Sequence, residues 1–517
     1  MYLNGFRKNK LICVSFFLFA NIIFWSRPFF GLDFSDSFFH INIALYSELK
    51  DYYVPFFLSS EIIRVLALIF GENLISFRLF NAFLLYLSLL SPFFILKGLK
   101  HTPSLWYISC GLLIFYPLNV NILGYDTLSV FILSLIFSFT CKYVLTQKTW
   151  VLLLLAVLSA IAVFIRLPNA VTLFILAGII WFHGTLRSCI IYFMLTVFSI
   201  AVGYLVYFKN LEGFLNAWYA TDTHTLPNLL AAYLKDVSKL LFYVISVIAI
   251  YFFRISLKSW KLSYSYKLLI LTIVITLYLF LVVGFTAYWR NFSLFLTATV
   301  IACGALNLLT NNFPEQPNFK KFVLLLVPFL LVIPSGSDTG LLKACFMFIL
   351  FPFVLALSKS KNNFWQLVLI LLVPFSLAQG VLMTYQDSAV YNLSKTPEIQ
   401  KISGVYTSRQ RAAFIEAVHG KIEKLRERGF KILVYGDKSH ILKYLYPESF
   451  SMTSFHQSIA SIEDLNNFKA LMPKGKTAIF MFYDYPPDAG RELPDEFVKE
   501  NNLKKISQDR FEYYIKD

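Results

Sequence analysis

The amino-acid sequence predicts a polytopic α-helical membrane protein of about thirteen transmembrane helices, followed by an α/β domain outside the membrane. Hydrophobic residues make up 57% of the 517 residues and charged residues only 15%. This composition is too apolar for an ordinary soluble protein. Apolar runs of about 17 to 25 residues, long enough to cross a bilayer as helices, follow one another as far as residue 384. Beyond that point the sequence becomes polar, which predicts the second domain.

Thirteen apolar intervals are the expected transmembrane segments. They are residues 11–30, 74–96, 103–122, 127–145, 149–165, 169–184, 188–208, 237–253, 267–287, 292–310, 321–334, 342–358 and 363–383. The first interval should remain as an anchor, because it is long and Ser26-Arg27-Pro28 lacks the small residues of a signal-peptide cleavage site. The division predicts a transmembrane domain over residues 1–384 and a soluble domain over residues 385–517.

The basic residues predict how these helices are oriented. With a cytoplasmic amino terminus, the cytoplasmic turns hold sixteen Lys and Arg residues, and eleven of the twelve acids in residues 1–384 fall on the outer side. This distribution satisfies the positive-inside rule. Topology and contact with anionic membrane lipids therefore account for the formal net charge of +16. We expect a multi-pass membrane protein with a cytoplasmic amino terminus, an extracytoplasmic carboxy-terminal domain and no nucleic-acid partner.

Residues 385–517 have the pattern of a small α/β domain. They carry 20 Lys and Arg against 18 Asp and Glu, a balance ordinary for a soluble domain. Apolar spacing predicts helices over residues 411–430 and 440–447, and apolar runs at 431–438 and 476–484 predict buried strands. Alternating strands and helices favour an α/β fold. We expect this domain to support or gate the membrane part, and the alternative is that it binds a ligand itself.

The first outer loop, residues 31–73, concentrates acidic residues just outside the first span. It opens with the stretch GLDFSDSFFH (31–40), which contains Asp33 and Asp36, and it holds four further acids. Two amphipathic segments, 37–53 and 55–70, should lie along the outer membrane surface as helices. Carboxylates under interfacial helices lie where a lipid headgroup must pass, so this loop is the expected place for chemistry.

This arrangement resembles the GT-C superfamily of glycosyltransferases, and within it the bacterial protein-mannosyltransferase-like and aminoarabinose-transferase-like membrane enzymes. The segment DFSDSFFHINIAL (33–45) is similar to the acidic first-loop segment of that family. YDTLSVFILSL (125–135) resembles the acidic start of a later span, and IRLPNA (165–170) resembles an Arg-Leu-Pro turn between two spans. Many relatives have Asp-Glu where this chain has Asp36-Ser37, which leaves the identity of the base and any metal dependence open.

The resemblance implies a glycosyltransferase that takes a hexosyl or pentosyl unit from a polyprenyl-phosphate donor. The acceptor would be a lipid, glycan or protein of the envelope, reached on the outer face of the membrane. Such a transfer needs a base for the acceptor's proton and a cationic cradle for the leaving phosphate. The donor contains no nucleotide diphosphate, so no cofactor is required. A divalent metal is not indicated by any ligand pattern in the sequence.

The acids and their neighbours are assigned as follows. Asp36 is the expected general base, and the alternative is an N-cap of the helix that follows. Asp33 is the second catalytic candidate, or else it positions the loop. Asp126 is either the N-cap of its span or a second acid at the site. Tyr125 and His40 are further cavity candidates, although a lone interfacial histidine is more often structural.

Four arginines on the outer side are candidates for binding the donor phosphate, because a guanidinium group binds phosphate oxygens in pairs. They are Arg166, Arg290, Arg78 and Arg64. The alternative for each is a side chain that reaches out to lipid headgroups. Asp338 lies in the stretch PSGSDTG (334–340), which is either a plain tight turn or a backbone that approaches a phosphate.

Two other classes of function remain open. A polysaccharide or lipid flippase would need charged residues lining a path inside its spans. A non-catalytic scaffold of envelope-glycan assembly would keep the carboxy-terminal domain but would tolerate the loss of Asp36. The acids cluster in the outer loops, with almost none in the middle of a span, which favours the transferase.

Overall fold

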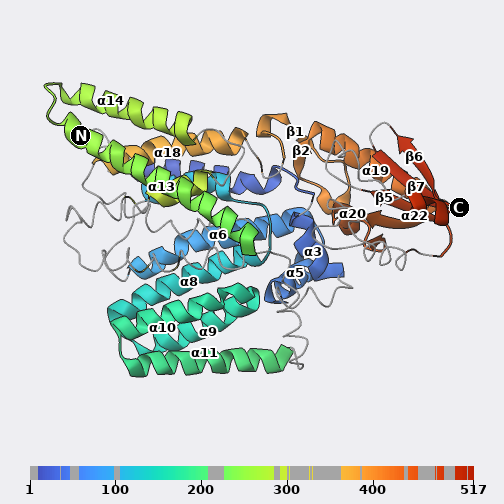
Figure 1. Ribbon diagram of the computed structural model, residues 1–517, viewed down its shortest axis with the longest axis horizontal. Coiled ribbons are helices and arrows are strands. Elements are labelled where there is room, and N and C mark those ends of the chain that lie inside the picture. Colours follow the sequence, from blue (N-terminus) through green and yellow to red (C-terminus); the bar gives the residue numbers. More distant parts are fainter. Residues whose placement is uncertain are drawn as a thin grey trace.

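Apolar helices form a bundle with a mixed β-sheet at one end in the computed structural model (Figure 1). The points marked N and C in Figure 1 lie toward opposite ends of the long axis of the molecule. The structure describes residues 10–34, 36–46, 57–97, 105–207, 226–283, 291–299, 363–382, 387–435, 440–451, 474–481, 495–508 and 511–516, together with the single residues 302, 325, 329, 384 and 472.

The first part of the chain supplies seven helices of the bundle. They are α2 (Lys10–Ser26), α6 (Leu74–Lys97), α7 (Leu105–Phe115), α8 (Tyr125–Thr146), α9 (Thr149–Ile165), α10 (Val171–His183) and α11 (Leu186–Tyr207). Later residues add α13 (Leu226–Leu257), α14 (Tyr264–Leu277) with a π-helical continuation (Tyr278–Val283), and α18 (Asn363–Leu382). Large apolar side chains such as Phe182, Phe198 and Leu281 are exposed on the bundle, which suits a surface in contact with lipid tails.

Ten of the thirteen expected spans coincide with apolar helices in the described part of the chain. Six helices are long and apolar enough to cross a membrane, and four more are shorter apolar helices. The protein is therefore a multi-pass membrane protein. The expected spans at 292–310, 321–334 and 342–358 lie largely outside the described residues, so the count of thirteen stays a prediction. Helix α13 begins at Leu226, well before the expected start of that span at residue 237.

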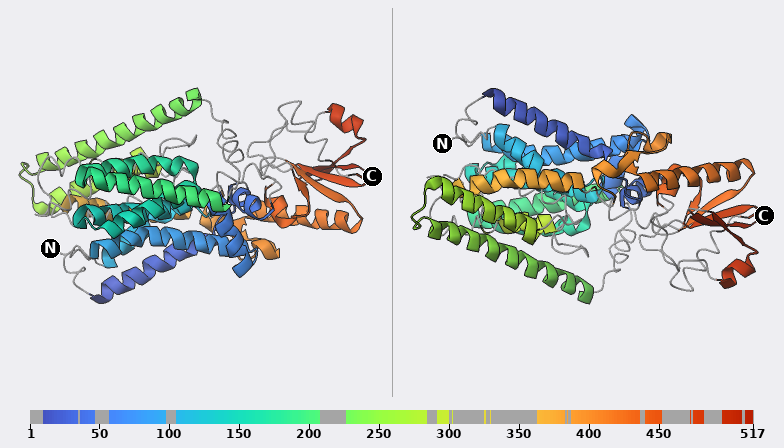
Figure 2. Two further views of the ribbon diagram at one scale, coloured as in Figure 1. Left: turned by 90° about the horizontal axis from the view of Figure 1, so that it is seen from below. Right: turned by 90° about the horizontal axis from the view of Figure 1, so that it is seen from above.

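Two short helices separate the bundle from the sheet. Helices α3 (Asp36–Tyr46) and α5 (Phe57–Phe70) confirm the two helices expected in the first outer loop. Both lie at the end of the bundle that faces the sheet (Figure 1, Figure 2). Val65, Leu68, Ile69 and Phe70 are exposed toward the end of α5, as expected of a helix that rests on a membrane surface.

The carboxy-terminal residues form a five-stranded mixed sheet with strand order β4-β3-β5-β7-β6. Strand β3 (Lys431–Tyr435) runs parallel to β4 (Phe450–Ser451) and β5 (Thr477–Met481), whereas β7 (Phe511–Lys516) is antiparallel to β5 and to β6 (Lys504–Gln508). Helices α19 (Arg409–Glu427), α20 (His440–Leu445) and α22 (Asp495–Glu500) accompany the sheet. The helices expected at 411–430 and 440–447 and the strands expected at 431–438 and 476–484 are thus confirmed as α19, α20, β3 and β5.

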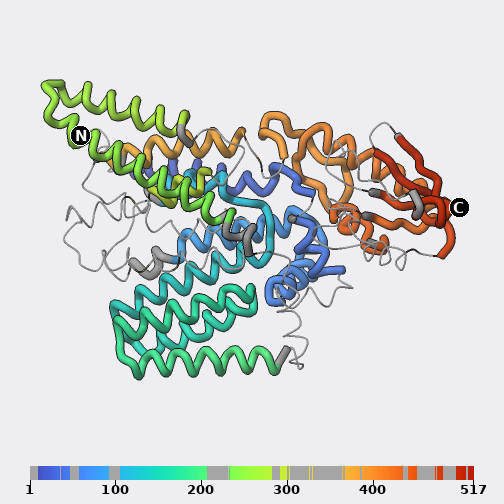
Figure 3. Tube along the Cα trace, viewed as in Figure 1, coloured from blue at the N-terminus to red at the C-terminus, as the bar shows by residue number. Residues whose placement is uncertain are grey.

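A separate hairpin joins the sheet region to the first outer loop. Strands β1 (Leu393–Lys395) and β2 (Tyr406–Ser408) are antiparallel, and β2 also forms an isolated parallel bridge between Tyr406 and Phe30. The trace leaving α2 therefore runs beside residues that lie nearly 380 positions later in the chain (Figure 3). This contact places the Asp33 segment at the junction of the two parts.

Candidate functional site

The candidate site begins at the head of α3, where Asp33 and Asp36 lie. Asp33 is 2% exposed, and its Oδ2 accepts the backbone N–H of Ser37, the second residue of α3, at 2.8 Å. Asp36 is the first residue inside α3, so Asp33, and not Asp36, accepts the described cap bond. A carboxylate at a helix N-terminus is favourable because the helix dipole is positive there. The side chain of Asp36 lies outside the described residues.

Three candidates from separate segments meet near this head. The ring of His40, on α3, packs edge-on against Tyr125 with centroids 5.0 Å apart. The guanidinium group of Arg166 also lies over the ring of Tyr125, with its Cζ 5.6 Å from the ring centroid. The sequence predicted these residues as candidates one by one, and the structure brings them together at one end of the bundle.

Local backbone features explain how each residue reaches this cluster. Tyr125 is the first residue of α8, and its N-cap is Gly124. A Cβ at Gly124 would lie 2.8 Å from His40 Cδ2, so only glycine leaves room for that ring. Arg166 has an extended backbone because α9 ends at Ile165 and Leu167-Pro168 opens a 3₁₀ helix. Its side chain is 3% exposed.

Asp126 lies in the first turn of α8, which Gly124 and not Asp126 caps. The N-cap alternative for Asp126 is therefore wrong. An acid in the first turn still suits the positive end of the helix dipole. Its proposed role as a second acid stays a prediction.

Buried polar side chains beneath the cluster hold the helix ends together, and sequence analysis did not single them out. Asn81 Nδ2 donates to the Val120 carbonyl at 2.9 Å, and its Oδ1 accepts from Thr127 Oγ1 at 2.7 Å. Asn169 Nδ2 donates to Ser129 Oγ at 2.8 Å and to a carbonyl of α9 at 3.0 Å. The sequence signal that could have identified them is an asparagine next to an apolar run, because an amide inside a membrane bundle needs hydrogen-bond partners.

Two of the predicted phosphate-binding arginines hold the first outer loop. Arg78 is 1% exposed, and its Nη1 donates to the carbonyl oxygens of Gly31 at 2.7 Å and Pro28 at 3.3 Å. Such burial excludes the headgroup alternative for Arg78. Arg64 Nε donates to the Ala44 carbonyl at 2.6 Å and its Nη1 pairs with Glu61 at 3.0 Å, which ties α5 to α3. Phosphate binding by either side chain stays a prediction.

The remaining predicted positions lie outside what the structure describes. Arg290 and Asp338 fall in such segments. Among the residues that are described, no group of three or more His, Cys, Asp or Glu side chains could hold a metal ion.

The Glu72 cluster, formed by Tyr46, Glu72, Lys401 and Tyr444, joins the first outer loop to the carboxy-terminal part. Lys401 Nζ lies 2.9 Å from Glu72 Oε2, 2.9 Å from the Tyr46 hydroxyl and 2.9 Å from the Tyr444 carbonyl. Tyr46 donates to Glu72, and the Tyr444 hydroxyl donates to the Glu72 carbonyl at 2.7 Å. Four groups of two distant segments therefore form one network.

Burial and hydrogen bonding shift the pKa values in this cluster. Burial, then the hydrogen bond to the Glu72 carboxylate, raises the pKa of Tyr46 far above its usual value. Burial works to raise the pKa of Glu72, but the hydrogen bonds from Tyr46 and Lys401 and the charge of Lys401 outweigh it, so this pKa lies below its usual value. The cluster thus pairs an anionic Glu72 with the Lys401 ammonium.

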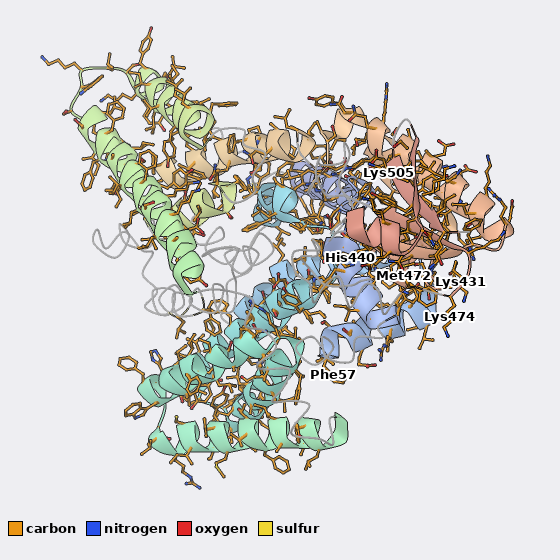
Figure 4. All side chains as sticks on the ribbon, turned by 45° about the vertical axis from the view of Figure 1, so that its right-hand side comes forward. Phe57, Lys431, His440, Met472, Lys474 and Lys505 are labelled. Carbon is orange, nitrogen blue, oxygen red and sulfur yellow. The ribbon has the colours of Figure 1, made fainter. Side chains whose placement is uncertain are left out.

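His440 makes a third contact between the two parts. Its carbonyl accepts a hydrogen bond from Asn42 Nδ2 of α3 at 2.7 Å, and its ring lies edge-on to Phe39 with centroids 5.4 Å apart. His440 is labelled in Figure 4, where it lies between the helical part and the sheet. Helix α3 is consequently held along its length by residues from the carboxy-terminal part.

Comparison with known proteins finds a likeness among solved structures. No family model and no curated protein sequence matches the chain. The structure is similar to the crystal structure of ArnT from Cupriavidus metallidurans bound to undecaprenyl phosphate, with a TM-score of 0.43 and 13% sequence identity over 97% of each chain.

Proposed function

We propose that this protein is an integral membrane glycosyltransferase that transfers a sugar from a polyprenyl-phosphate donor to an envelope acceptor. The observation that carries the proposal is the meeting of His40, Tyr125 and Arg166 beside the head of α3, which bears Asp33 and Asp36. Two acids, a buried guanidinium and aromatic rings thus share one end of a membrane bundle. The segments that contain these residues, 33–45, 125–135 and 165–170, are also the ones that resemble GT-C glycosyltransferases, which supports the proposal of a transferase.

The residues have distinct roles in the proposed reaction. The acceptor hydroxyl oxygen forms a bond to the anomeric carbon, and the bond from that carbon to the donor phosphate oxygen breaks. The Asp36 carboxylate takes the hydroxyl proton, while Asp33 holds the first turn of α3. Arg166 offsets the charge of the leaving polyprenyl phosphate. Attack opposite to the leaving group inverts the anomeric centre.

The proposed orientation places the sheet and the candidate site on the outer side of a bacterial cytoplasmic membrane. It is supported by the basic residues of the opposite turns, such as Lys142, Lys148 and Arg187. In Figure 2 the amino terminus lies at the end of the bundle away from the sheet. The acceptor would therefore be an extracytoplasmic lipid, glycan or protein.

The distribution of charge in the helices favours a transferase over a flippase. In the described spans, charged side chains such as Arg78, Asp236 and Arg254 lie toward helix ends. A flippase path would need polar or charged groups along the middle of the spans. The experiment below also separates the two classes, because a flippase forms no glycosidic bond.

The test is sugar transfer by the purified protein in lipid vesicles. The probes are tritiated undecaprenyl-phosphate hexose and undecaprenyl-phosphate pentose, and membranes of a gene-deletion strain supply the acceptor. We expect labelled acceptor with the wild type and a loss of at least about 100-fold with Asp36→Asn, the lower end of what a general base contributes. The control is Glu398→Gln, whose side chain is 90% exposed. Equal labelling by Asp36→Asn and the wild type would refute the assignment, and no labelling by any form would refute the transferase.

A further inference from the structure

Residues far apart in the chain hold the peptide groups of Leu32 from both sides. The Leu32 N–H donates to Asp387 Oδ2 at 2.8 Å, and the Leu32 carbonyl accepts from Arg411 Nη1 at 2.8 Å. Leu32 is fully buried and directly precedes Asp33. Asp387 and Arg411, both from the carboxy-terminal part, therefore bind the backbone of the residue that precedes Asp33.

Asp387 is itself fixed by several donors. Its Oδ1 accepts the Ser388 N–H at 2.8 Å and the Ser408 N–H at 3.3 Å, and its Oδ2 accepts from Thr407 Oγ1 at 2.5 Å. The side chain is 1% exposed, and Arg411 Nη1 lies 3.8 Å from Oδ1. A buried carboxylate with this many partners has one defined position, since loss of any partner would leave a costly unpaired group.

Arg411 acts on both sides of Asp33. Besides the bond to Leu32, its guanidinium lies over the ring of Phe34, with Cζ 4.8 Å from the centroid. Its own backbone N–H is capped by Ser408 Oγ at 3.4 Å in the first turn of α19. The guanidinium therefore extends from a rigid helix start onto the residues before and after Asp33.

The preceding residue, Gly31, is equally constrained. Its N–H donates to the Tyr406 carbonyl at 2.8 Å, and its carbonyl accepts from Arg78 at 2.7 Å. Its φ of 81° is in the left-handed region, and a Cβ would lie 2.6 Å from Thr384 Cβ, so glycine alone fits. The backbone from Gly31 to Leu32 is thus bonded at every N–H and carbonyl.

We infer that Asp387 and Arg411 are positioning residues that fix Asp33, and through its bond to Ser37 the Asp36 turn, for the reaction. The inference deepens the proposed function and rests on it. A general base works only within hydrogen-bond reach of the acceptor hydroxyl, and misplacement by about 1 Å costs on the order of 100-fold in rate. Arg78 anchors the loop only as far as Gly31, so Asp387 and Arg411 are the described partners that fix the residue next to Asp33.

The Glu72 cluster supplies a matched control. Lys401 also joins the first outer loop to the carboxy-terminal part, but its partners there are Glu72, beyond α5, and Tyr46, at the far end of α3, and not the segment next to Asp33. If the Asp387–Arg411 pair only tethered the two parts, Lys401→Met and Arg411→Met would affect the enzyme alike. If the pair positions the acids, the two variants would differ in kcat.

The experiment uses the vesicle assay with the tritiated donor that the wild type uses faster. We expect Arg411→Met and Asp387→Asn to lower kcat by about 100-fold while KM for the donor stays within about twofold of wild type. Arg411→Lys should recover part of the rate, because an ammonium can still donate to the Leu32 carbonyl. Lys401→Met should keep kcat, and hydrogen exchange of the peptide covering residues 30–38 should rise only in the Arg411 and Asp387 variants.

The outcomes separate this inference from the function beneath it. If Asp36→Asn is inactive while Arg411→Met keeps the wild-type kcat, the inference is overturned and the transferase stands. An equal fall of kcat in Lys401→Met and Arg411→Met would also overturn it, since general tethering would then suffice. If the wild type transfers no sugar, the proposed function fails and the inference falls with it.

Discussion

Arg166 lies over the face of Tyr125, with its Cζ 5.6 Å from the ring centroid. This pair links the turn after α9 to the first residue of α8. A guanidinium held over a ring in a buried position keeps a fixed orientation. It therefore presents its fork in one direction, as binding of a phosphate group requires.

Substitution of Arg166 by Lys should weaken binding of the donor. An ammonium retains the charge but loses the planar fork, so we expect KM for the donor to rise about 10- to 100-fold, the equivalent of one charge-assisted hydrogen bond. The measurement is the initial rate against donor concentration. Arg254→Lys is the control. Arg254 lies over the ring of Tyr251 in the same way, but it is in the last turn of α13, away from the candidate site. An unchanged KM in Arg166→Lys would exclude the phosphate role.

Substitution of Gly124 by Ala should displace His40. The added Cβ would lie 2.8 Å from His40 Cδ2, so the ring and the turn of α3 below it must move. We expect transfer to fall at least tenfold, with membrane abundance near that of the wild type. Gly178→Ala is the matched control, since nothing lies within 4 Å of a Cβ there. Equal activity of the two variants would show that the His40 contact is dispensable.

The stability of the protein should depend on pH through Glu72. Its pKa lies below the ordinary value of 4.5 in the folded state, so its contribution to stability is fully present above about pH 4.5 and is lost as the pH falls through the folded pKa. The difference in melting temperature between wild type and Glu72→Gln should therefore shrink in acid. A difference that stays constant from pH 7 to pH 3 would contradict this account of the cluster.

Removal of the Asn169 amide should destabilise the bundle. Asn169→Leu removes the donor to Ser129 Oγ and to the α9 carbonyl. That carbonyl keeps the Arg166 N–H as a donor, but the buried Ser129 Oγ loses its amide partner, at a cost of about 1 to 3 kcal/mol. Thermal unfolding in detergent measures the effect. Ser238→Ala is the control, because Ser238 is exposed and its described hydrogen bond is to the Lys235 carbonyl of its own helix, at 2.8 Å. It should change stability by less than about 0.5 kcal/mol.

The helices were predictable from the sequence because their signal is local. Apolar runs fixed the approximate bounds of α8 and α9, and amphipathic spacing identified α3 and α5. The exact starts were less accessible. The sequence pattern offered Asp36 and Asp126 as caps. The structure makes Gly124 the N-cap of α8, and in α3 the carboxylate of Asp33 accepts the Ser37 N–H of the first turn, because a cap depends on where the backbone bends and not on residue type alone.

The contacts that organise the site were beyond the sequence. Leu32 pairs with Asp387 and Arg411 across 355 and 379 positions, and periodicity carries no information on such distant pairs. The partners of Arg78 were likewise not predictable from the sequence. The sequence offered it as a phosphate ligand or a headgroup contact, whereas its observed partners are backbone carbonyls of Pro28 and Gly31.

The central claim is that the head of α3 is the reaction site of a sugar transferase. Mass spectrometry of envelope glycans tests it most directly, in a deletion strain complemented with wild type, Asp36→Asn or Glu398→Gln at equal membrane abundance. The account predicts that the Asp36→Asn glycans lack one sugar unit, while Glu398→Gln matches the wild type. Glycans of normal mass with Asp36→Asn, when deletion of the gene still changes them, would contradict it and indicate a transporter or a scaffold.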